Sequence, residues 1–261
     1  MTSAAADLVD LAMRSLSSAV QVQRGPDREW HRTNLLDHEQ RYRADLRLIA
    51  GLKPSGTILD IGSAPCHMTA LLQLTGQPVI GVDLAPQRVA NLVEHFKLDV
   101  RQCDIERAQL PFADGQFCGA LLCETFEHLR VDPALVISEI CRVLSIGGFL
   151  LITTPNVYSL PSLARYALGR SIADPLLEFG KLRNLGHMGH VREYSAREVV
   201  RFVCACGFAV ESVDYRYYVN RRSRKSRILG VAYKLVPRRF RRDIVVLARK
   251  INDGPGLVPL A

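Results

Sequence analysis

The segment Thr57–Ala70, with the sequence TILDIGSAPCHMTA, constrains the fold of this chain more than any other stretch. Its first part, Ile58–Ile61, is an apolar run typical of a strand that is buried on both faces. Gly62 and several small residues follow, and then helix-forming residues, so we expect a strand, a tight turn and the start of a helix. In open α/β sheets such turns lie at the carboxyl ends of the strands, where backbone N–H groups face ligands. The turn is therefore a candidate binding site.

Apolar strand-like runs and helical stretches alternate regularly after this turn, which predicts a doubly wound α/β sheet of the Rossmann-like kind. With 261 residues, 48% of them apolar, the chain is long enough for a sizeable core. We expect helices at Met68–Leu74, Pro86–Phe96, Pro133–Leu144 and Ala196–Gly207, and strands at Val79–Asp83, near Val100, and at Cys118–Cys123, Phe149–Thr153, Phe208–Val219 and Asp243–Arg249.

The turn resembles the first motif of the class I S-adenosylmethionine (SAM)-dependent methyltransferases, strand-Asp-x-Gly-x-Gly-x-Gly. Asp60 and Gly62 match it, whereas Ala64 and Cys66 stand at the next two glycine positions. A nucleotide-binding dehydrogenase is the competing interpretation, because Asp83, 23 residues after Asp60, suits the ribose hydroxyls of either cofactor. A third acid, Asp104 after the strand near Val100, favours the methyltransferase. The alternative in which these acids only cap helices or begin loops suits an isolated acid better than three in the expected order.

The resemblance extends from Leu59 to Thr154 and implies a seven-stranded sheet, mostly parallel with an antiparallel last strand. It implies that Asp83 holds the ribose and that Asp104 faces the adenine amino group. The residues that it places at the cofactor are Asp60, Gly62, Ala64, Asp83, Leu84, Asp104, Ile105 and Cys123.

Four regions follow from this organisation. Residues 1–50 form an N-terminal helical cap, with a polar connection at 21–34 between two helices, and residues 51–154 form the SAM-binding core. Residues 155–194 are an insertion over the active site, where substrate specificity is expected. Residues 195–261 complete the sheet and carry a basic amphipathic arm at about 221–242.

A Glu-x-x-Glu-His motif directly follows the fourth expected strand: Glu124, Glu127 and His128. On one helical turn, residues i, i+3 and i+4 share a face, so the three side chains would converge close to the methyl group. Two carboxylates and an imidazole suit a divalent ion such as Mg²⁺, Mn²⁺ or Fe²⁺. His187 and His190 in the insertion offer the further ligand or a base.

This pairing resembles two groups of metal-dependent O-methyltransferases, which act on small RNAs and on ubiquinone precursors. The phrase His190-Val191-Arg192-Glu193-Tyr194-Ser195 resembles the RNA group, with His190 as the fourth ligand beside Glu124, Glu127 and His128. His187 would then accept the proton. In a metal-free alternative, His190 or His128 is the general base and Glu127 orients it. We expect a Mg²⁺ or Mn²⁺ site under the first interpretation and none under the second.

The positive charge is concentrated near the end of the chain. Between Arg216 and Lys250 there are 13 Lys or Arg and one acid, whereas the whole chain has a net charge of +8. Such a stretch suits an anionic membrane surface or a phosphate backbone, although a solvated connection between two strands is the commoner outcome. Seven scattered cysteines and the lack of a signal-like or membrane-spanning run predict a cytoplasmic protein with reduced thiols.

We therefore expect a SAM-dependent methyltransferase that methylates a hydroxyl of a sugar, glycolipid or natural product, with peripheral contact to an anionic membrane. A quinone-ring or small-RNA O-methyltransferase is the alternative enzyme. A non-catalytic protein of this fold that binds nucleic acid or membrane is the alternative of another class, and neither the acceptor nor the oligomeric state follows from the sequence.

Overall fold

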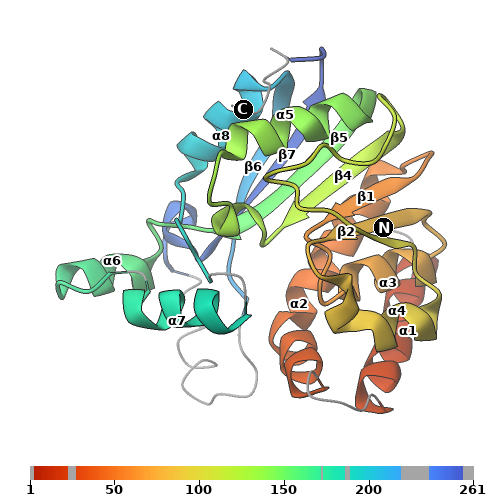
Figure 1. Cartoon of the computed structure of the whole chain (residues 1–261), viewed down its shortest axis with the longest axis horizontal. Helices are drawn as coiled ribbons and strands as arrows, with labels where there is room; N and C mark the ends of the chain where they lie inside the picture. Colours follow the sequence, from red (N-terminus) through yellow and green to blue (C-terminus); the bar gives the residue numbers. More distant parts are fainter. Residues whose placement is uncertain (1–2, 23–27, 172, 186–188, 219–234, 255–261) are drawn as a thin grey trace.

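A computed structural model describes residues 3–22, 28–171, 173–185, 189–218 and 235–254. Its centre is a seven-stranded sheet with helices on both faces (Figure 1). The strands are β1 (Ile58–Ile61), β2 (Val79–Asp83), β3 (Val100–Gln102), β4 (Phe117–Cys123), β5 (Leu144–Pro155), β6 (Phe208–Arg216) and β7 (Asp243–Lys250). The α-helices are α1 (Ser3–Val22), α2 (Arg28–Leu52), α3 (His67–Leu74), α4 (Ala90–Phe96), α5 (Pro133–Val143), α6 (Leu160–Ala167), α7 (Pro175–Leu185) and α8 (Ala196–Ala205). Short 3₁₀ helices are η1 (Pro86–Val89), η2 (Phe126–His128) and η3 (Arg238–Phe240).

The strand order is β3-β2-β1-β4-β5-β7-β6. Strands β1 to β5 pair in parallel, and β7 runs antiparallel to both of its neighbours, β5 and β6. The expected doubly wound, seven-stranded sheet with an antiparallel last strand is confirmed. The order reverses between β1 and β4, so the loops that follow these two strands diverge and leave a crevice at their carboxyl ends.

Two apolar layers cover the sheet, because successive strand residues point to opposite faces. Ile58 belongs to the layer that contains α1 to α4, whereas its neighbour Leu59 belongs to the layer that contains α5 and α8. In β4 the same alternation places Leu121 in the first layer and Leu122 in the second. These side chains are all buried, which confirms that the apolar runs in the sequence are strands covered on both faces.

The first turns of α2 differ from the expected polar connection at 21–34. Residues 28–34 are helical, while 23–27 lie outside the described residues. Tertiary contacts explain the difference: the guanidinium of Arg88 lies over the Trp30 ring at 5.1 Å, and His31 Nδ1 lies 3.3 Å from His67 Nε2. Packing against neighbouring elements therefore stabilises a helix that local composition does not predict.

Other element ends also differ from the sequence-based ranges. The stretch Pro86–Phe96 divides into η1 and α4, and β5 begins at Leu144, so that it includes Gly147 and Gly148 with a bulge opposite β4. Two helices begin where their capping residues stand. The Asp132 carboxylate accepts a hydrogen bond from the Ala134 amide at the start of α5, and Ser195 forms a capping box at the start of α8.

The insertion carries α6 and α7, which project beyond the carboxyl ends of the strands (Figure 1). Of the expected basic arm at 221–242, residues 221–234 lie outside the described part of the chain, whereas η3 is described. Asn156, at the start of the insertion, donates hydrogen bonds to the carbonyls of Arg239 and Arg241, which places η3 beside the insertion. The described helices include none with the length and apolar character needed to cross a bilayer.

Candidate active site

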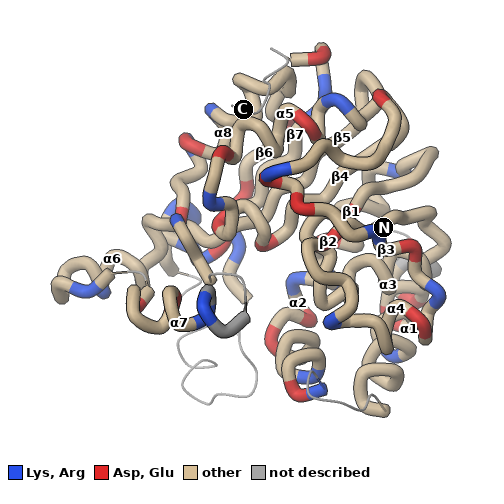
Figure 2. Tube along the Cα trace, viewed as in Figure 1, with Lys and Arg blue, Asp and Glu red and all other residues tan. Residues whose placement is uncertain are grey.

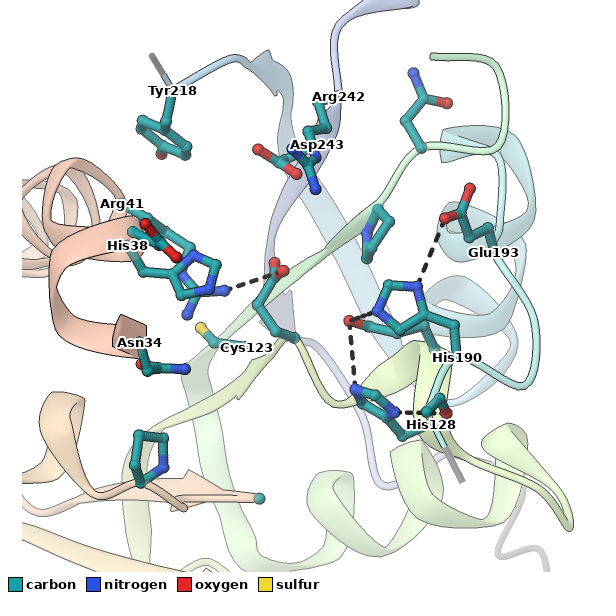
Figure 3. Close-up of a pocket in the computed structure, with 18 of the residues that line it drawn as sticks. Asn34, His38, Arg41, Cys123, His128, His190, Glu193, Tyr218, Arg242 and Asp243 are labelled. Atoms are coloured by element: carbon teal, nitrogen blue, oxygen red, sulfur yellow. Dashed lines mark hydrogen bonds and ion pairs between the residues drawn. The ribbon is translucent and has the colours of Figure 1, made fainter. Parts of the chain in front are cut away.

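Two adjoining cavities open at the point where the strand order reverses. The larger, about 960 Å³, lies between α2, the turn after β1, η2, the end of β5 and the insertion (Figure 3). The smaller, about 300 Å³, lies over the ends of β2 and β3. Gly62, Ala64, Glu124 and His128 line both, so the two cavities meet above the turn and the end of β4.

The turn after β1 is held by contacts that only a small residue permits. Gly62 has φ +68, and a Cβ there would lie 2.3 Å from Thr125 Oγ1. Asp60 is buried, and its carboxylate accepts a 2.6 Å hydrogen bond from Thr69 Oγ1 of α3. Burial raises the pKa of Asp60 to about 6. Asp60, a carboxyl group with a raised pKa, therefore lines the larger cavity.

The two positions where the resembled motif has glycine are occupied without loss of the turn. Cys66 has φ +62 and is fully buried at the start of α3, where it lines neither cavity. The Ala64 amide donates a 3.0 Å hydrogen bond to Asp83 Oδ2, and the Ala85 amide donates to Asp83 Oδ1 at 2.9 Å. Asp83 therefore fixes the turn after β1 against the end of β2.

The predicted cofactor residues divide between the two cavities. Most of them line the smaller one: Gly62, Ala64, Asp83, Leu84, Asp104 and Ile105. Asp60 and Cys123 line the larger one. Asp104 follows β3 and lines the smaller cavity, and its Oδ1 accepts a hydrogen bond from the Glu106 amide. The structure therefore brings the predicted cofactor residues to two adjoining cavities, and their binding of a cofactor stays a prediction.

Glu124 is separated from the rest of its motif. Its backbone has φ +53, and its carboxylate accepts a 2.9 Å hydrogen bond from Thr153 Oγ1 and lies 3.0 Å from Arg41 Nη1 of α2. The expected shared face of one helical turn is therefore absent at Glu124, whose backbone is left-handed, and the group of potential metal ligands among the described residues consists of Glu127, His128 and His190.

Glu127, His128 and His190 converge at the meeting point of the cavities. Each offers one ligand atom, and the three atoms lie within 4.8 Å of one another. Glu127 Oε1 is 3.9 Å from His128 Nε2 and 4.0 Å from His190 Nε2. This oxygen is buried and has no hydrogen-bond partner among the described residues. An orphaned carboxylate oxygen facing two imidazole nitrogens is a suitable donor set for a divalent ion.

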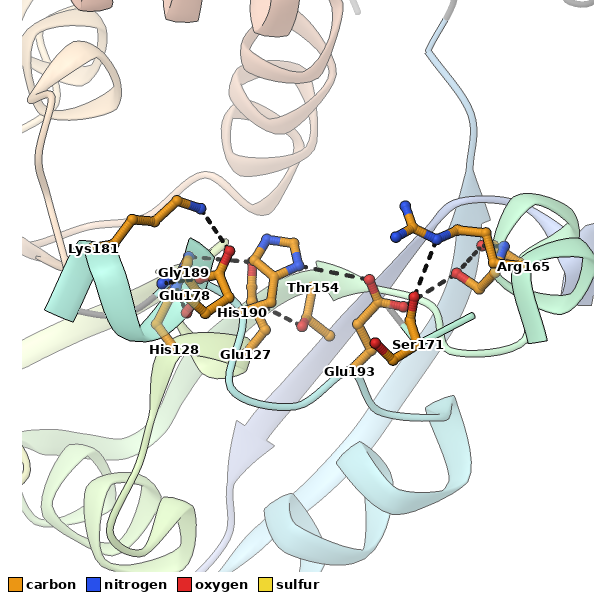
Figure 4. A network of polar contacts seen from close by, with 12 residues as sticks. Glu127, His128, Thr154, Arg165, Ser171, Glu178, Lys181, Gly189, His190 and Glu193 are labelled. Atoms are coloured by element: carbon orange, nitrogen blue, oxygen red, sulfur yellow. Dashed lines mark hydrogen bonds and ion pairs between the residues drawn. The ribbon is translucent and has the colours of Figure 1, made fainter. Parts of the chain in front are cut away.

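The other atoms of these three side chains are held by neighbours (Figure 4). Thr154 Oγ1 donates to Glu127 Oε2 at 2.9 Å, and His128 Nδ1 lies 2.8 Å from the Gly189 carbonyl. An N–H at this Nδ1 leaves the lone pair of Nε2 free to bind a metal, as in many histidine sites. Glu193 lies 3.6 Å from His190 Nδ1 and, together with Glu127, raises the pKa of His190. His187, the other candidate, lies outside the described residues.

Residues 59–152 match a protein-family profile described as "Methyltransferase domain". The matched part runs from β1 to β5 and contains the turn, Asp83, Asp104 and the Glu-x-x-Glu-His motif.

The relatives are named for the same activity. A "Probable S-adenosylmethionine-dependent methyltransferase" of Mycolicibacterium smegmatis is 29% identical over 155 residues, 59% of this chain and 52% of that protein. A protein of Mycobacterium tuberculosis with the same description is 27% identical over 161 residues, 60% of this chain and 51% of that protein. The chain thus spans about half the length of these relatives. A SAM-dependent methyltransferase structure from Archaeoglobus fulgidus shares the fold, with a TM-score of 0.59, 19% identity, and coverage of 82% of this chain and 94% of that one.

Seven residues of α2, outside the matched residues 59–152, line the cavities and were not among the sequence candidates: Trp30, Asn34, Asp37, His38, Arg41, Tyr42 and Asp45. Trp30 borders both cavities, whereas Arg41 and Tyr42 border the larger one. Arg41 is buried, and its Nη1 has no hydrogen-bond partner among the described residues, although it lies within ion-pair distance of Glu124. The single Trp of the chain is a signal that sequence analysis could have used, but nothing in the local sequence distinguishes Arg41 from the other arginines of α2.

Proposed function

We propose that this chain is a SAM-dependent methyltransferase that transfers the methyl group to a hydroxyl oxygen, with a divalent ion held by Glu127, His128 and His190. The observation that carries the proposal is the orphaned Glu127 Oε1, which faces two imidazole nitrogens where the two cavities meet. Such an arrangement suits a site that keeps open positions for a substrate, because three protein ligands leave part of the coordination sphere free.

The small cavity suits the adenosine part of the cofactor. Asp83 would accept hydrogen bonds from the ribose hydroxyls, and Asp104 would accept one from the adenine amino group. The methionine part would then extend over Gly62 toward Asp60 and Arg41, whose opposite charges suit its ammonium and carboxylate groups. This direction places the methyl group close to His128, which borders both cavities.

The reaction requires that the acceptor lose a proton, to His187 or to water, as its oxygen attacks the methyl carbon and the sulfonium becomes a neutral thioether. Methyl transfer is efficient only when the oxygen is held in line at about 3 Å. A bound divalent ion would supply Lewis acidity that lowers the pKa of a hydroxyl. Glu127, His128 and His190 would hold the ion, Thr154 and Glu193 would fix two of these ligands, and Glu124 would keep Arg41 in place.

The lining of the larger cavity favours a polar acceptor without a phosphate backbone. Among the described residues that line it, eight are Asp or Glu and four are Lys or Arg. A polyanion would be repelled by this excess of carboxylates, whereas a molecule rich in hydroxyls would find many hydrogen-bond acceptors. The lining therefore supports a sugar, glycolipid or natural-product hydroxyl over RNA.

A metal-free alternative rests on the contact between His190 and Glu193. In this version His190 is the general base, and Glu193 orients its ring. The raised pKa of His190 means that the base is neutral only at higher pH, so activity would rise with pH through that pKa. The two versions differ in whether Glu127 binds an ion.

A binding experiment separates the versions and needs no acceptor. We expect the chain to bind Mn²⁺, measured by calorimetry and by the loss of the free-ion electron paramagnetic resonance signal. Glu127→Gln removes the charge but keeps the shape, and should weaken Mn²⁺ binding at least about tenfold, the loss expected for one ligand or its supporting contact. Glu124→Gln is the matched control, because this acid of the same motif contacts Arg41 instead, and should leave Mn²⁺ affinity unchanged.

Failure of Mn²⁺ binding in the folded wild-type chain would contradict the metal site and leave the metal-free version. Calorimetry with SAM tests the enzyme itself. A folded chain that does not bind SAM would contradict the proposed methyltransferase and favour a protein of this fold that binds other partners.

A further inference from the structure

The helices of the insertion expose large apolar side chains to solvent. No residue of α6 is buried. Leu176 and Leu177 at the start of α7 are 78% and 64% exposed, and Leu168 after α6 is 72% exposed. We call the following residues the apolar surface of the insertion: Leu160, Tyr166, Leu168, Leu176, Leu177 and Phe179, each at least 40% exposed. Exposed apolar residues gathered in one small unit usually mark a site that another surface covers.

Positive charge accompanies this surface. Within residues 156–185 the cations are Arg165, Arg170, Lys181 and Arg183, and the acids are Asp174 and Glu178. Glu178 is buried and pairs with Lys181, so these two charges cancel, and Arg165, Arg170 and Arg183 remain against Asp174. Figure 2 shows Lys and Arg at the outer end of α6 and at the C-terminal end of α7.

More cations lie at the base of the insertion. The hydrogen bonds from Asn156 hold η3 there, and Arg238 of η3 is 75% exposed. Leu235, which precedes η3, is 87% exposed. Apolar side chains next to cations, on short helices outside the main core, are the composition of segments that lie in the interface of an anionic bilayer.

The inner side of the same insertion lines the larger cavity. Ser162 and Arg165 of α6, Ala173 before α7, and Lys181 of α7 all border it. A head group inside the cavity would therefore have its apolar part next to α6 and α7. The insertion thus both lines the larger cavity and carries the exposed apolar side chains.

We propose that α6 and α7 bind the surface of an anionic lipid bilayer, and that the methyl acceptor is the polar head group of an amphiphile anchored in it. Only the statement about the acceptor rests on the proposed methyl transfer. A second copy of the chain fits this surface less well, because a two-fold contact would bring the cations of both copies together. Two helices of 8 and 11 residues also offer little of the roughly 800 Å² per partner that a stable interface needs.

Vesicle co-sedimentation of the whole chain tests the proposal. Phosphatidylglycerol–phosphatidylcholine vesicles should bind the wild type, and pure phosphatidylcholine vesicles should bind it more weakly. We expect Leu176→Asn/Leu177→Asn to reduce partitioning at least about tenfold, because two inserted apolar side chains are lost. Arg170→Gln/Arg183→Gln should remove most of the preference for phosphatidylglycerol and most of the dependence on salt.

The matched control is Ile146→Asn/Ile251→Asn. These residues are 64% and 57% exposed, but they lie at the opposite end of the sheet, at the start of β5 and after the end of β7. The control should bind vesicles like the wild type, and all variants should bind SAM like the wild type. Equal vesicle binding by the α7 variant and the control, or no binding by the wild type, would overturn the membrane proposal while SAM binding still supported the enzyme. A dimer that dissociates in Leu176→Asn/Leu177→Asn would overturn it in favour of a second copy.

Discussion

Three carboxylates of the site are nearly inaccessible to solvent, with exposures of 4% for Asp60, 0% for Asp45 and 1% for Glu127. Two of them also have an oxygen without a hydrogen-bond partner among the described residues: Asp45 Oδ2 and Glu127 Oε1. Buried charge of this kind costs stability unless it is paired. Its concentration around one cavity is typical of residues kept for a ligand at the expense of stability.

Asp60 offers a direct test of this conflict between stability and function. Burial raises its pKa from 3.8 to about 6, so the folded state binds a proton more tightly than the unfolded state does. Stability is therefore lost as the pH rises between about 4 and 6, and the ionised group costs about 3 kcal/mol at pH 7. Asp60→Asn cannot ionise and should raise the free energy of unfolding at pH 7 by up to that amount, with little effect at pH 4.

The same substitution should weaken SAM binding, because the ammonium group loses its charged partner. Urea denaturation at both pH values and calorimetry with SAM measure the two effects. A variant that is equally destabilised at pH 4 and pH 7 would show that the carboxylate is stabilising, contrary to this argument.

The sequence predicted which acidic residues lie near the site, but it did not predict which groups their side chains contact. Asp83 and Asp104 were expected at the carboxyl ends of their strands, and register alone places them at one edge of a parallel sheet. The direction of Glu124 depends on its φ of +53 and on a cation 83 positions earlier in the chain, neither of which the motif contains. Likewise, His190 was expected near His128, but the role of the Gly189 carbonyl as a support for His128 needs the folded chain.

Among elements, the turn between β1 and α3 depends on its contact with the loop after β4. Gly62 packs directly against Thr125, whose Oγ1 also donates a 3.3 Å hydrogen bond to the Ile61 carbonyl. The two loops that diverge from the centre of the sheet are thereby locked together under both cavities. The positions of Asp60 and of η2 relative to each other follow from this one contact.

A substitution at Gly62 tests the lock. Gly62→Ala places a Cβ 2.3 Å from Thr125 Oγ1 at a positive φ, and should destabilise the fold by about 2–4 kcal/mol from strain and overpacking together. Gly76→Ala is the control, because it has φ +81 and open space around its Cβ, so it shows the backbone cost alone, about 1 kcal/mol. Chemical denaturation measures both.

Thr125→Ala in the Gly62→Ala background should restore part of the lost stability by removing the nearest atoms. Equal costs at Gly62 and Gly76 would show that the loops can move apart freely. The conclusion that they are locked together would then be wrong.

Element types followed from apolar periodicity because strands buried on both faces and helices with one apolar stripe have distinct patterns. The start of α2 did not follow from periodicity, because residues 28–34 are polar. Contacts with His67 and Arg88, which lie in other elements, stabilise this part of the helix. The division at η1 also depends on local backbone geometry after Pro86 that composition does not determine.

At the scale of the whole molecule, α2 closes the site by joining two distant parts of the sheet. Arg41 lies 3.0 Å from Glu124 after β4, and Asp45, one helical turn later, pairs with Arg216 at the end of β6. Both contacts are largely buried. The N-terminal region is therefore part of the cavity wall, and its boundary at residue 50 separates sequence segments rather than independent functional units.

Arg41→Met tests whether this closure holds the molecule together. The substitution keeps most of the apolar stem but leaves Glu124 without its cation and Asp45 with Arg216 as its remaining cation, so the free energy of unfolding should fall by about 3–5 kcal/mol. Arg43→Met is the matched control on the same helix. Its partners Glu39 and Asp10 are about half exposed, and such pairs contribute roughly 0–1 kcal/mol.

Adding Glu124→Gln to Arg41→Met should recover part of the lost stability, because the uncompensated charge is removed. Hydrogen exchange should locate the weakening in α2 and in the loop after β4, and SAM affinity should fall with Arg41→Met but not with Arg43→Met. Equal stability of the two single variants would contradict the closure by α2, since the buried ion pair would then contribute no more than an exposed one.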